Sequence, residues 1–190
     1  MALVLLASGC ASTTQATSSR APAVVPARHE ALSTYRELGL TFQAPPGLAV
    51  SHVPVGAGIP AVGLTPDGED PASASEQIVV ADNTRGNSGD VGVIAARTAG
   101  ADSVAAHSAH ATGFRSTIGN ASVPGAWDAA TLTETYSAVL PGAAAPAAVK
   151  REWIFIQVGP RHFRELLALV VASRATTLDP AAVTSSVTLG

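Results

Sequence analysis

Residues 149–173 read VKREWIFIQVGPRHFRELLALVVAS, and this stretch decides the fold. Pro160 interrupts it in the middle and presets φ for a turn, so the spacing predicts two antiparallel strands joined by a short loop. A loop centred there pairs Ile154 with Leu167. Both faces of this hairpin are apolar, whereas strands with one solvated face alternate apolar and polar residues. We therefore expect the hairpin to lie in the middle of a sheet that is covered on both faces.

Length and composition describe a chain with one apolar core. The 190 residues are 47% hydrophobic and 13% charged, which favours one domain with a sizeable core over two smaller domains. The formal net charge of −3 and the pI of about 5.9 argue against a nucleic-acid-binding protein, which would carry a concentrated basic surface. We expect no nucleic acid among its partners.

The single cysteine, Cys10, indicates where the protein resides. The residues before it, MALVLLASG, form a short apolar run that ends in small residues, which is typical of an export signal. This run is too short to span a bilayer, which needs about 20 apolar residues. Residues 6–10, LASGC, resemble the lipobox of bacterial lipoproteins, in which the cysteine is acylated and becomes the new N-terminus. We expect a lipoprotein signal peptide over residues 1–9 and a lipid anchor on Cys10, at the extracytoplasmic face of the cell membrane.

Two further expectations follow from the position of Cys10 and from its being the single cysteine. No Lys or Arg precedes it, so we expect the true start codon to lie upstream and basic residues to be encoded there. Because the chain has one cysteine, it can form no internal disulfide. The alternative is that Cys10 is an ordinary cysteine in a plain secretory signal.

Residues 11–27, ASTTQATSSRAPAVVPA, are rich in Ser, Thr, Ala and Pro and have no apolar period. Such a composition is typical of a disordered tether. We therefore expect the lipidated cysteine and its tether to occupy residues 10–27 and a single domain to occupy residues 28–190.

Several short elements are predicted on the N-terminal side of the hairpin from their periodicity and their Gly and Pro boundaries. We expect a helix over residues 29–38, strands over residues 40–44, 77–81 and 91–97, and another strand near residues 48–53 or 61–64. The strands over 77–81 and 91–97 flank a polar, Gly-rich linker and should form a hairpin.

A central helix is predicted after Gly100, with Asp102 as its N-cap and its end near Ile118. Val104 and Phe114 fall on one stripe with Ile118 at 100° per residue, and this stripe should face the sheet.

The C-terminal part of the chain adds a strand and a helix. Residues 127–140 alternate β-forming residues and predict a strand. Asp179 can cap a last short helix with Pro180 at its first position, and Val183 and Val187 should face inward. Grouped strands with helices between and beside them predict an α+β fold, an antiparallel β-sheet flanked by helices.

This order of elements resembles a known family. The lipobox, the tether, a Thr-Phe-x-x-Pro-Pro-Gly segment at residues 41–47, the central helix, and the late hairpin followed by Asp179 and Pro180 are similar to the LpqN/LpqT-type lipoproteins of actinobacteria. These belong to the PsbP-like α/β/α sandwich group. Leu48 departs from the family pattern, in which tryptophan often follows Pro-Gly. The resemblance implies a surface-anchored domain without enzymatic activity or shared catalytic residues.

A serine-protease site is the first chemical alternative. Residues 85–90, RGNSGD, superficially resemble the surroundings of a nucleophilic serine, and His52 and Asp82 precede Ser88 in chymotrypsin-like order. The three lie within about forty residues, no disulfide supports them, and the G-x-S-x-G elbow is absent. We therefore interpret the segment as the polar tip of a hairpin, and we expect no catalytic residues.

A metal site is the second alternative. His107 and His110 lie three residues apart, so one helix could present both to a metal ion. No nearby carboxylate or cysteine completes three ligands. We expect neither a metal nor a cofactor.

Basic residues gather at both ends of the hairpin and could contact anionic headgroups or an acidic partner, although solvated strand ends look the same. At the open end these are Lys150, Arg151 and Arg174, and at the turn they are Arg161, His162 and Arg164.

Three aromatic residues, Trp153, Phe155 and Phe114, are the candidate contacts for a ligand or partner, although core filling explains them equally. The first functional hypothesis is a surface lipoprotein whose domain binds a protein or an envelope component without catalysis. The alternative is a carrier with a small-ligand or lipid pocket between sheet and helix.

Overall fold

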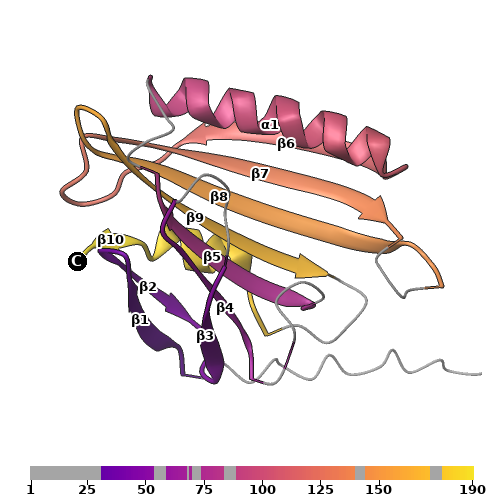
Figure 1. The fold of residues 1–190 in the computed structure, drawn as a ribbon, viewed down its shortest axis with the longest axis horizontal. Coiled ribbons are helices and arrows are strands. Elements are labelled where there is room, and N and C mark those ends of the chain that lie inside the picture. Colours follow the sequence, from indigo (N-terminus) through magenta and orange to yellow (C-terminus); the bar gives the residue numbers. More distant parts are fainter. Residues whose placement is uncertain are drawn as a thin grey trace, which may run out of the picture.

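The computed structural model describes residues 31–53, 59–67, 69, 74–83, 89–139, 144–171 and 177–190 (Figure 1). The expected signal peptide, Cys10 and the tether lie outside the described residues, as do Ser88 and Arg174.

A seven-stranded antiparallel sheet forms the centre of the domain, in the order β3-β4-β5-β9-β8-β7-β6. Its strands are β3 (Leu48–His52), β4 (Ala61–Pro66), β5 (Glu76–Asp82), β6 (Thr112–Asn120), β7 (Asp128–Ala138), β8 (Ala147–Gly159) and β9 (His162–Val171).

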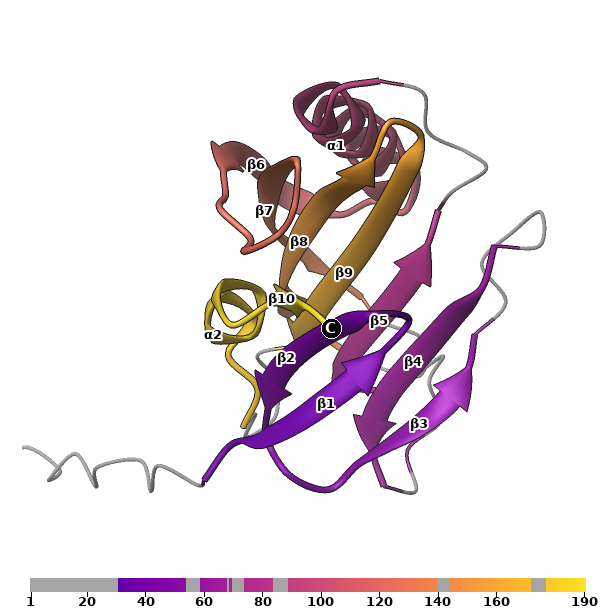
Figure 2. The same cartoon turned by 90° about the vertical axis from the view of Figure 1, so that its left-hand side faces the viewer.

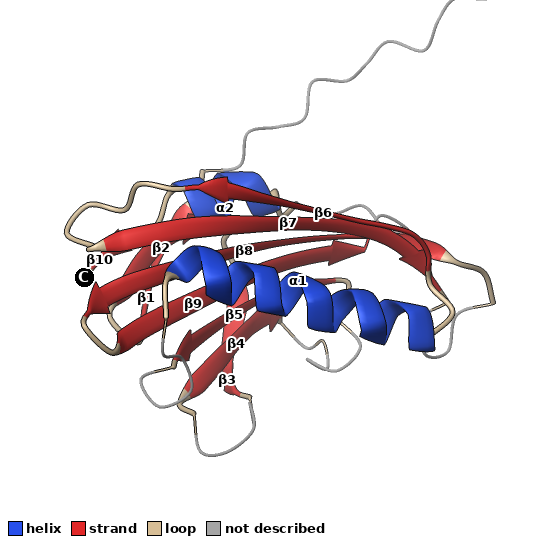
Figure 3. Ribbon diagram, turned by 90° about the horizontal axis from the view of Figure 1, so that it is seen from above, coloured by secondary structure: helices blue, strands red, loops and turns tan. Residues whose placement is uncertain are grey.

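Different elements cover the two faces of this sheet (Figures 1 and 2). Helix α1 (Val91–Ser108) packs over β6, β7 and β8 on one face and runs lengthwise along them (Figure 3). On the other face lie helix α2 (Pro180–Ser185) and a three-stranded sheet in the order β1-β2-β10. Its strands are β1 (Ser33–Glu37), β2 (Leu40–Ala44) and β10 (Thr188–Leu189).

The predicted hairpin is β8 and β9, and its central, doubly covered position is confirmed. Ile154 and Ile156 face the small sheet and α2, in a core that includes Phe42 and Val183. Phe155 faces α1, in a second core. All these side chains are at most 2% exposed, so the apolar residues on both faces of the hairpin are buried in the two cores.

The predicted register of this hairpin is wrong by one residue. Ile154 pairs with Leu166 and not with Leu167, because an irregularity between Gln157 and Gly159 shifts the pairing next to the turn. A shift of one residue exchanges the faces of a strand. Phe163 therefore lies with Phe155 beneath α1.

The helix predicted over residues 29–38 is wrong, since Ser33–Glu37 is strand β1. Leu38 and Gly39 have φ values of 48° and 75°, which suits a two-residue hairpin loop to β2. Tyr35 stacks on Phe42 across the pair, with ring centroids 5.8 Å apart. Cross-strand packing thus overrides the helix propensity of this segment.

The central helix begins and ends earlier than predicted. Residues 91–97 are helical rather than a strand, and Asp90 is the N-cap, with its carboxylate accepting a hydrogen bond of 2.6 Å from the Gly92 N–H. Asp102 therefore lies inside the helix. The second half of the predicted helix is strand β6, so Phe114 belongs to that strand.

Other elements agree with the sequence. The strand over 40–44 is confirmed, strands occur at both places considered within 48–75, and the strands over 77–81 and 127–140 correspond to β5 and β7. Asp179 caps α2, and Val183 and Val187 are buried. The α+β class is therefore confirmed, although a second sheet provides much of the cover that helices were expected to provide.

Candidate functional site: a buried acidic cluster beneath helix α1

A carboxylate is buried between α1 and the sheet. Ala130 and Leu132 of β7 point toward α1, and Glu134, the next residue of the same parity, lies on that face as well. Its Cα partner on β8 is Arg151, and Asp102 reaches the same place from α1. We refer to Asp102, Glu134 and Arg151 as the acidic cluster.

The cation of this cluster is shared between two acids. Arg151 Nη1 lies 3.6 Å from Asp102 Oδ2 and 3.9 Å from Glu134 Oε2. The Glu134 side chain is 0% exposed, while those of Asp102 and Arg151 are 21% and 28% exposed. These distances permit ion pairing but are too long for strong hydrogen bonds.

Hydrogen bonding in the acidic cluster is incomplete. Among the described residues, seven buried side-chain N or O atoms have no hydrogen-bond partner, and five belong to this region. They are Asp102 Oδ2, Glu134 Oε1 and Oε2, Arg151 Nε and Trp153 Nε1. Asp102 Oδ2 and Glu134 Oε2 have only their long ion-pair contacts with Arg151. Buried polar atoms normally have a hydrogen bond, so a concentration of atoms without one marks a candidate functional site.

Burial raises the pKa of Glu134 to about 7, and the neighbouring Asp102 carboxylate adds to the rise. Arg151 and Trp153 oppose the rise. Burial also raises the pKa of the Tyr136 hydroxyl, against the influence of Arg151. The cluster can therefore take up or release a proton at Glu134 near neutral pH.

Aromatic side chains surround the acidic cluster. The Arg151 guanidinium lies 5.2 Å from the Tyr136 ring centroid, within range of a cation–π contact. Phe114 stacks on Tyr136 with ring centroids 6.1 Å apart, and Trp153 stacks on Phe155 at 5.7 Å.

The three predicted contact residues are thus on the same side of the sheet, but in different environments. Phe155 is 1% exposed and belongs to the core, and Trp153 packs against that core. Phe114 is partly buried on β6, two strands away from Trp153. Phe155 is a core residue, whereas Trp153 and Phe114 flank the acidic cluster.

Sequence reasoning missed Glu134. Within the strand predicted over residues 127–140, Glu134 has the same parity as Ala130, Leu132 and Tyr136. A carboxylate within an apolar strand face was the available signal.

The other candidate residues are not assembled into a site. His107 and His110 are both exposed, and within the described ranges no group of three or more His, Cys, Asp or Glu could hold a metal ion. Asp82 lies 3.2 Å from His162 Nε2, whereas His52 is exposed on β3. In the serine-protease alternative His52 would accompany Asp82, but His162 is the histidine beside it, and Ser88 lies outside the described residues.

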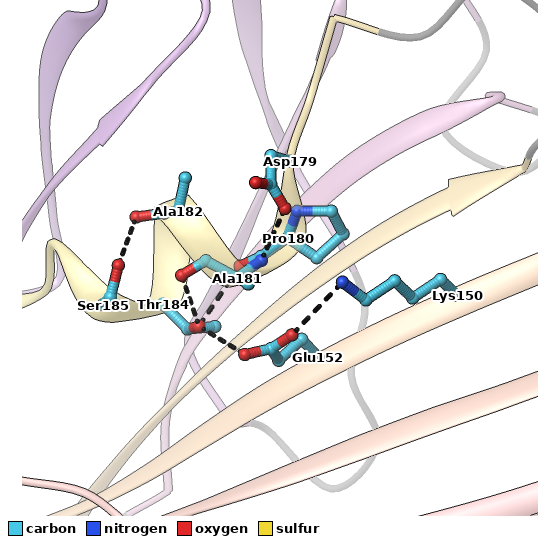
Figure 4. Close-up of polar contacts among 8 residues, drawn as sticks. All are labelled: Lys150, Glu152, Asp179, Pro180, Ala181, Ala182, Thr184 and Ser185. Carbon is cyan, nitrogen blue, oxygen red and sulfur yellow. Dashed lines mark hydrogen bonds and ion pairs between the residues drawn. The ribbon is translucent and has the colours of Figure 1, made fainter.

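Basic residues of the hairpin act separately. Arg151 faces α1, whereas Lys150 points to the opposite face and lies 3.7 Å from Glu152 (Figure 4). At the turn, Arg164 Nη1 donates a 2.7 Å hydrogen bond to the Gly39 carbonyl oxygen. Lys150 and Arg151 thus do not meet, contrary to the expectation from sequence.

Comparison with known proteins gives a distant structural likeness only. No protein-family model and no curated protein matches the chain. The solution structure of cyanobacterial PsbP from Synechocystis sp. PCC 6803 is similar, with a TM-score of 0.45, 14% sequence identity, and coverage of 85% of this chain and 94% of that one. A crystal structure of a Pseudomonas aeruginosa protein of unknown function has a TM-score of 0.34 and 11% identity, and covers 75% of this chain and 84% of that one. Neither described helix is long and apolar enough to cross a membrane.

Proposed function

We propose that the chain is a lipid-anchored surface protein whose domain binds another protein without catalysis, through the outer face of α1. The anchor is Cys10, at the extracytoplasmic face of the cell membrane. The lipobox, the tether and the order of elements support membership of the LpqN/LpqT-type lipoproteins with their PsbP-like α/β/α sandwich.

The exposed apolar residues on the outer face of α1 carry this proposal. Val91, Ile94, Ala95, Ala99 and Ala106 are buried toward the sheet. The outer face is also apolar, since Val93 is 45% exposed and Val104 is 68% exposed. The exposed positions of α1 are Val93, Ala96, Arg97, Gly100, Ala101, Ser103, Val104, Ala105, His107 and Ser108. Exposed apolar residues on one face of a helix are typical of an interaction site, so the outer face of α1 suits a partner.

The nature of the exposed side chains favours a protein partner over a membrane surface. Helices that lie on membranes present Trp, Phe or Leu beside a polar face rich in Lys and Arg. The exposed positions of α1 include none of those apolar residues, and Arg97 is their only Lys or Arg. Small side chains instead let another secondary-structure element approach closely.

A carrier of small ligands is the second candidate. Atoms of the acidic cluster and of Trp153 that have no hydrogen bond favour a polar ligand group beneath the C-terminal half of α1. Beneath the N-terminal half of α1, Ile94 and Ala95 form one buried core with Phe155 and Phe163. These two aromatic side chains therefore fill the core and do not line a pocket for a ligand. The protein-binding hypothesis therefore agrees better with the described contacts.

The test is site-specific photo-crosslinking of the full-length protein in its native host. A photoreactive residue replaces Val104 or, as a control, Val50, which is 52% exposed on the edge strand β3. We expect a discrete protein adduct from position 104 and none from position 50, and Val104→Glu should abolish co-purification of that protein. Equal labelling at both positions, or none at 104, would reject the protein-binding face. A small-molecule adduct at 104 would favour the carrier.

The anchor has a separate test. Mass spectrometry of the native protein should find an N-terminal peptide that begins at acylated Cys10. A peptide that begins elsewhere, or an unmodified Cys10, would overturn the lipoprotein assignment without affecting the binding face.

A further inference from the structure

We propose that the acidic cluster is a proton-dependent contact that holds the C-terminal half of α1 against the sheet, and thereby makes partner binding by α1 depend on pH. The effect on binding rests on the proposed function. The proton-dependent contact itself is a property of the isolated chain and can be tested without a partner.

The two halves of α1 are held differently. Its N-terminal half contributes Val91, Ile94, Ala95 and Ala99 to the core beneath it. Beyond Ala99, the buried residue of the helix is Ala106, and Asp102 makes the ion pair with Arg151. Attachment of the C-terminal half therefore depends on the charge state of the acidic cluster.

The groups that face Glu134 come from each neighbouring element. Asp102 faces it from α1, Arg151 and the Trp153 indole from β8, and Tyr136 from its own strand. Its Cα partner on β6 is Ser116, which does not titrate. One cation thus serves two carboxyl groups.

Protonation of Glu134 balances these charges. A protonated Glu134 leaves Asp102 and Arg151 as a one-to-one pair, and its O–H can donate to the Asp102 carboxylate. When Glu134 ionises, two carboxylates compete for Arg151 in a buried place, and like charges without full compensation are costly there. Asp102 is the only one of the three on α1, so its separation from the sheet relieves the repulsion.

The pKa values of Glu134 in the closed and open states of the helix determine how opening changes with pH. The pKa of Glu134 is about 7 with the helix closed, against 4.5 when the carboxyl is exposed. From pH 6 to pH 8, the ratio of open to closed helix should therefore rise about tenfold. The contact is most stable below pH 4.5, and the C-terminal turns of α1 open more often as the pH rises through 7.

Hydrogen exchange of the full-length protein tests this contact. After correction for the intrinsic pH dependence of exchange, we expect peptides that cover residues 101–109 to lose about tenfold in protection from pH 6 to pH 8, and peptides that cover residues 91–99 to change little. Glu134→Gln should remove the difference. Glu152→Gln is the matched control, since Glu152 lies on the opposite face of the sheet, and it should retain the difference.

Two further experiments distinguish failure of the proton-dependent contact from failure of the binding face. Asp102→Asn, which removes the like charge, should move the loss of protection to lower pH, and this arm remains informative if Glu134→Gln does not fold. Protection that is independent of pH in the native sequence, or unchanged by Glu134→Gln, would overturn the inference. Photo-crosslinking at position 104 should be stronger at pH 6 than at pH 8. Crosslinking without pH dependence would leave the binding face intact and reject its regulation, whereas pH-dependent exchange without crosslinking would reject the binding face alone.

Discussion

Asp102 on α1 and Glu134 on β7 share the guanidinium of Arg151, with the nearest atoms 3.6 and 3.9 Å away. The helix and the sheet are thus joined by two acids and one base. An arrangement of this kind is balanced only when one acid is protonated.

Global stability should reflect the proton on Glu134. Its pKa is raised from 4.5 to about 7, so the folded state keeps a proton that the unfolded state releases between these values. The stabilisation is complete below pH 4.5 and is lost as the pH rises through 7, by at most about 3 kcal/mol. Urea denaturation should show Glu134→Gln more stable than the native sequence at pH 8. A constant difference between the two proteins from pH 4.5 to pH 8 would be inconsistent with this titration.

Removal of the shared cation should be costly where both acids are ionised. We expect Arg151→Met to lower the free energy of unfolding by about 2 kcal/mol at pH 8, because it leaves buried carboxylates uncompensated. The loss should be smaller at pH 5, where Glu134 is protonated. Lys150→Met is the control, since its pair with Glu152 is on the opposite face and Lys150 is 38% exposed, and it should cost less than about 0.5 kcal/mol. Equal losses for the two variants in urea denaturation would refute the assigned role of Arg151.

Much of the fold could be predicted from local patterns. The hairpin of β8 and β9 was recognisable because both of its faces are apolar, and α2 because Asp179 and Pro180 form a standard helix start. The predicted strand pairing is wrong by one residue because of the irregularity beside Gly159. The amino-acid sequence there does not distinguish a regular turn from one with an irregular pairing.

The errors have physical causes. Ser33–Glu37 consists of residues that a helix also accepts, and it becomes a strand by pairing with β2 across the tight turn at Leu38 and Gly39. The start of α1, VGVIAA, contains β-branched residues and no polar residue, so it shows no helical period and its sequence favours a strand. The acidic cluster was hidden for a related reason. Asp102 and Glu134 are 32 positions apart, and only the correct position of α1 brings them together.

Two glycines should respond oppositely to alanine. Gly39 has a φ of 75°, and the Arg164 guanidinium occupies the place of an added Cβ, so Gly39→Ala should destabilise by more than about 1 kcal/mol. Gly100 is on the exposed side of α1 with open space around it, so Gly100→Ala should stabilise by about 0.5–1 kcal/mol. Thermal unfolding can compare them, and a stabilising Gly39→Ala would contradict the described turn.

The attachment of α2 to β8 should depend on one hydroxyl. Thr184 Oγ1 donates to Glu152 Oε1 at 2.9 Å, and Thr184 is 3% exposed (Figure 4). Thr184→Val preserves the shape and removes this donor, and we expect a loss of about 1 kcal/mol. Ser185→Ala removes an exposed hydroxyl that donates to the Ala182 carbonyl within the helix, and it should have little effect in the same urea titration. The reverse order would show that Thr184 does not anchor the helix.

The most direct measurement is a carbon-13 NMR titration of the Glu134 side-chain carboxyl in the full-length protein, with its signal assigned by its absence in Glu134→Gln. We expect a midpoint close to pH 7, which would show that the buried acid retains its proton up to neutrality beneath α1. A midpoint near the ordinary value of 4.5 would contradict the proton-dependent contact between helix and sheet.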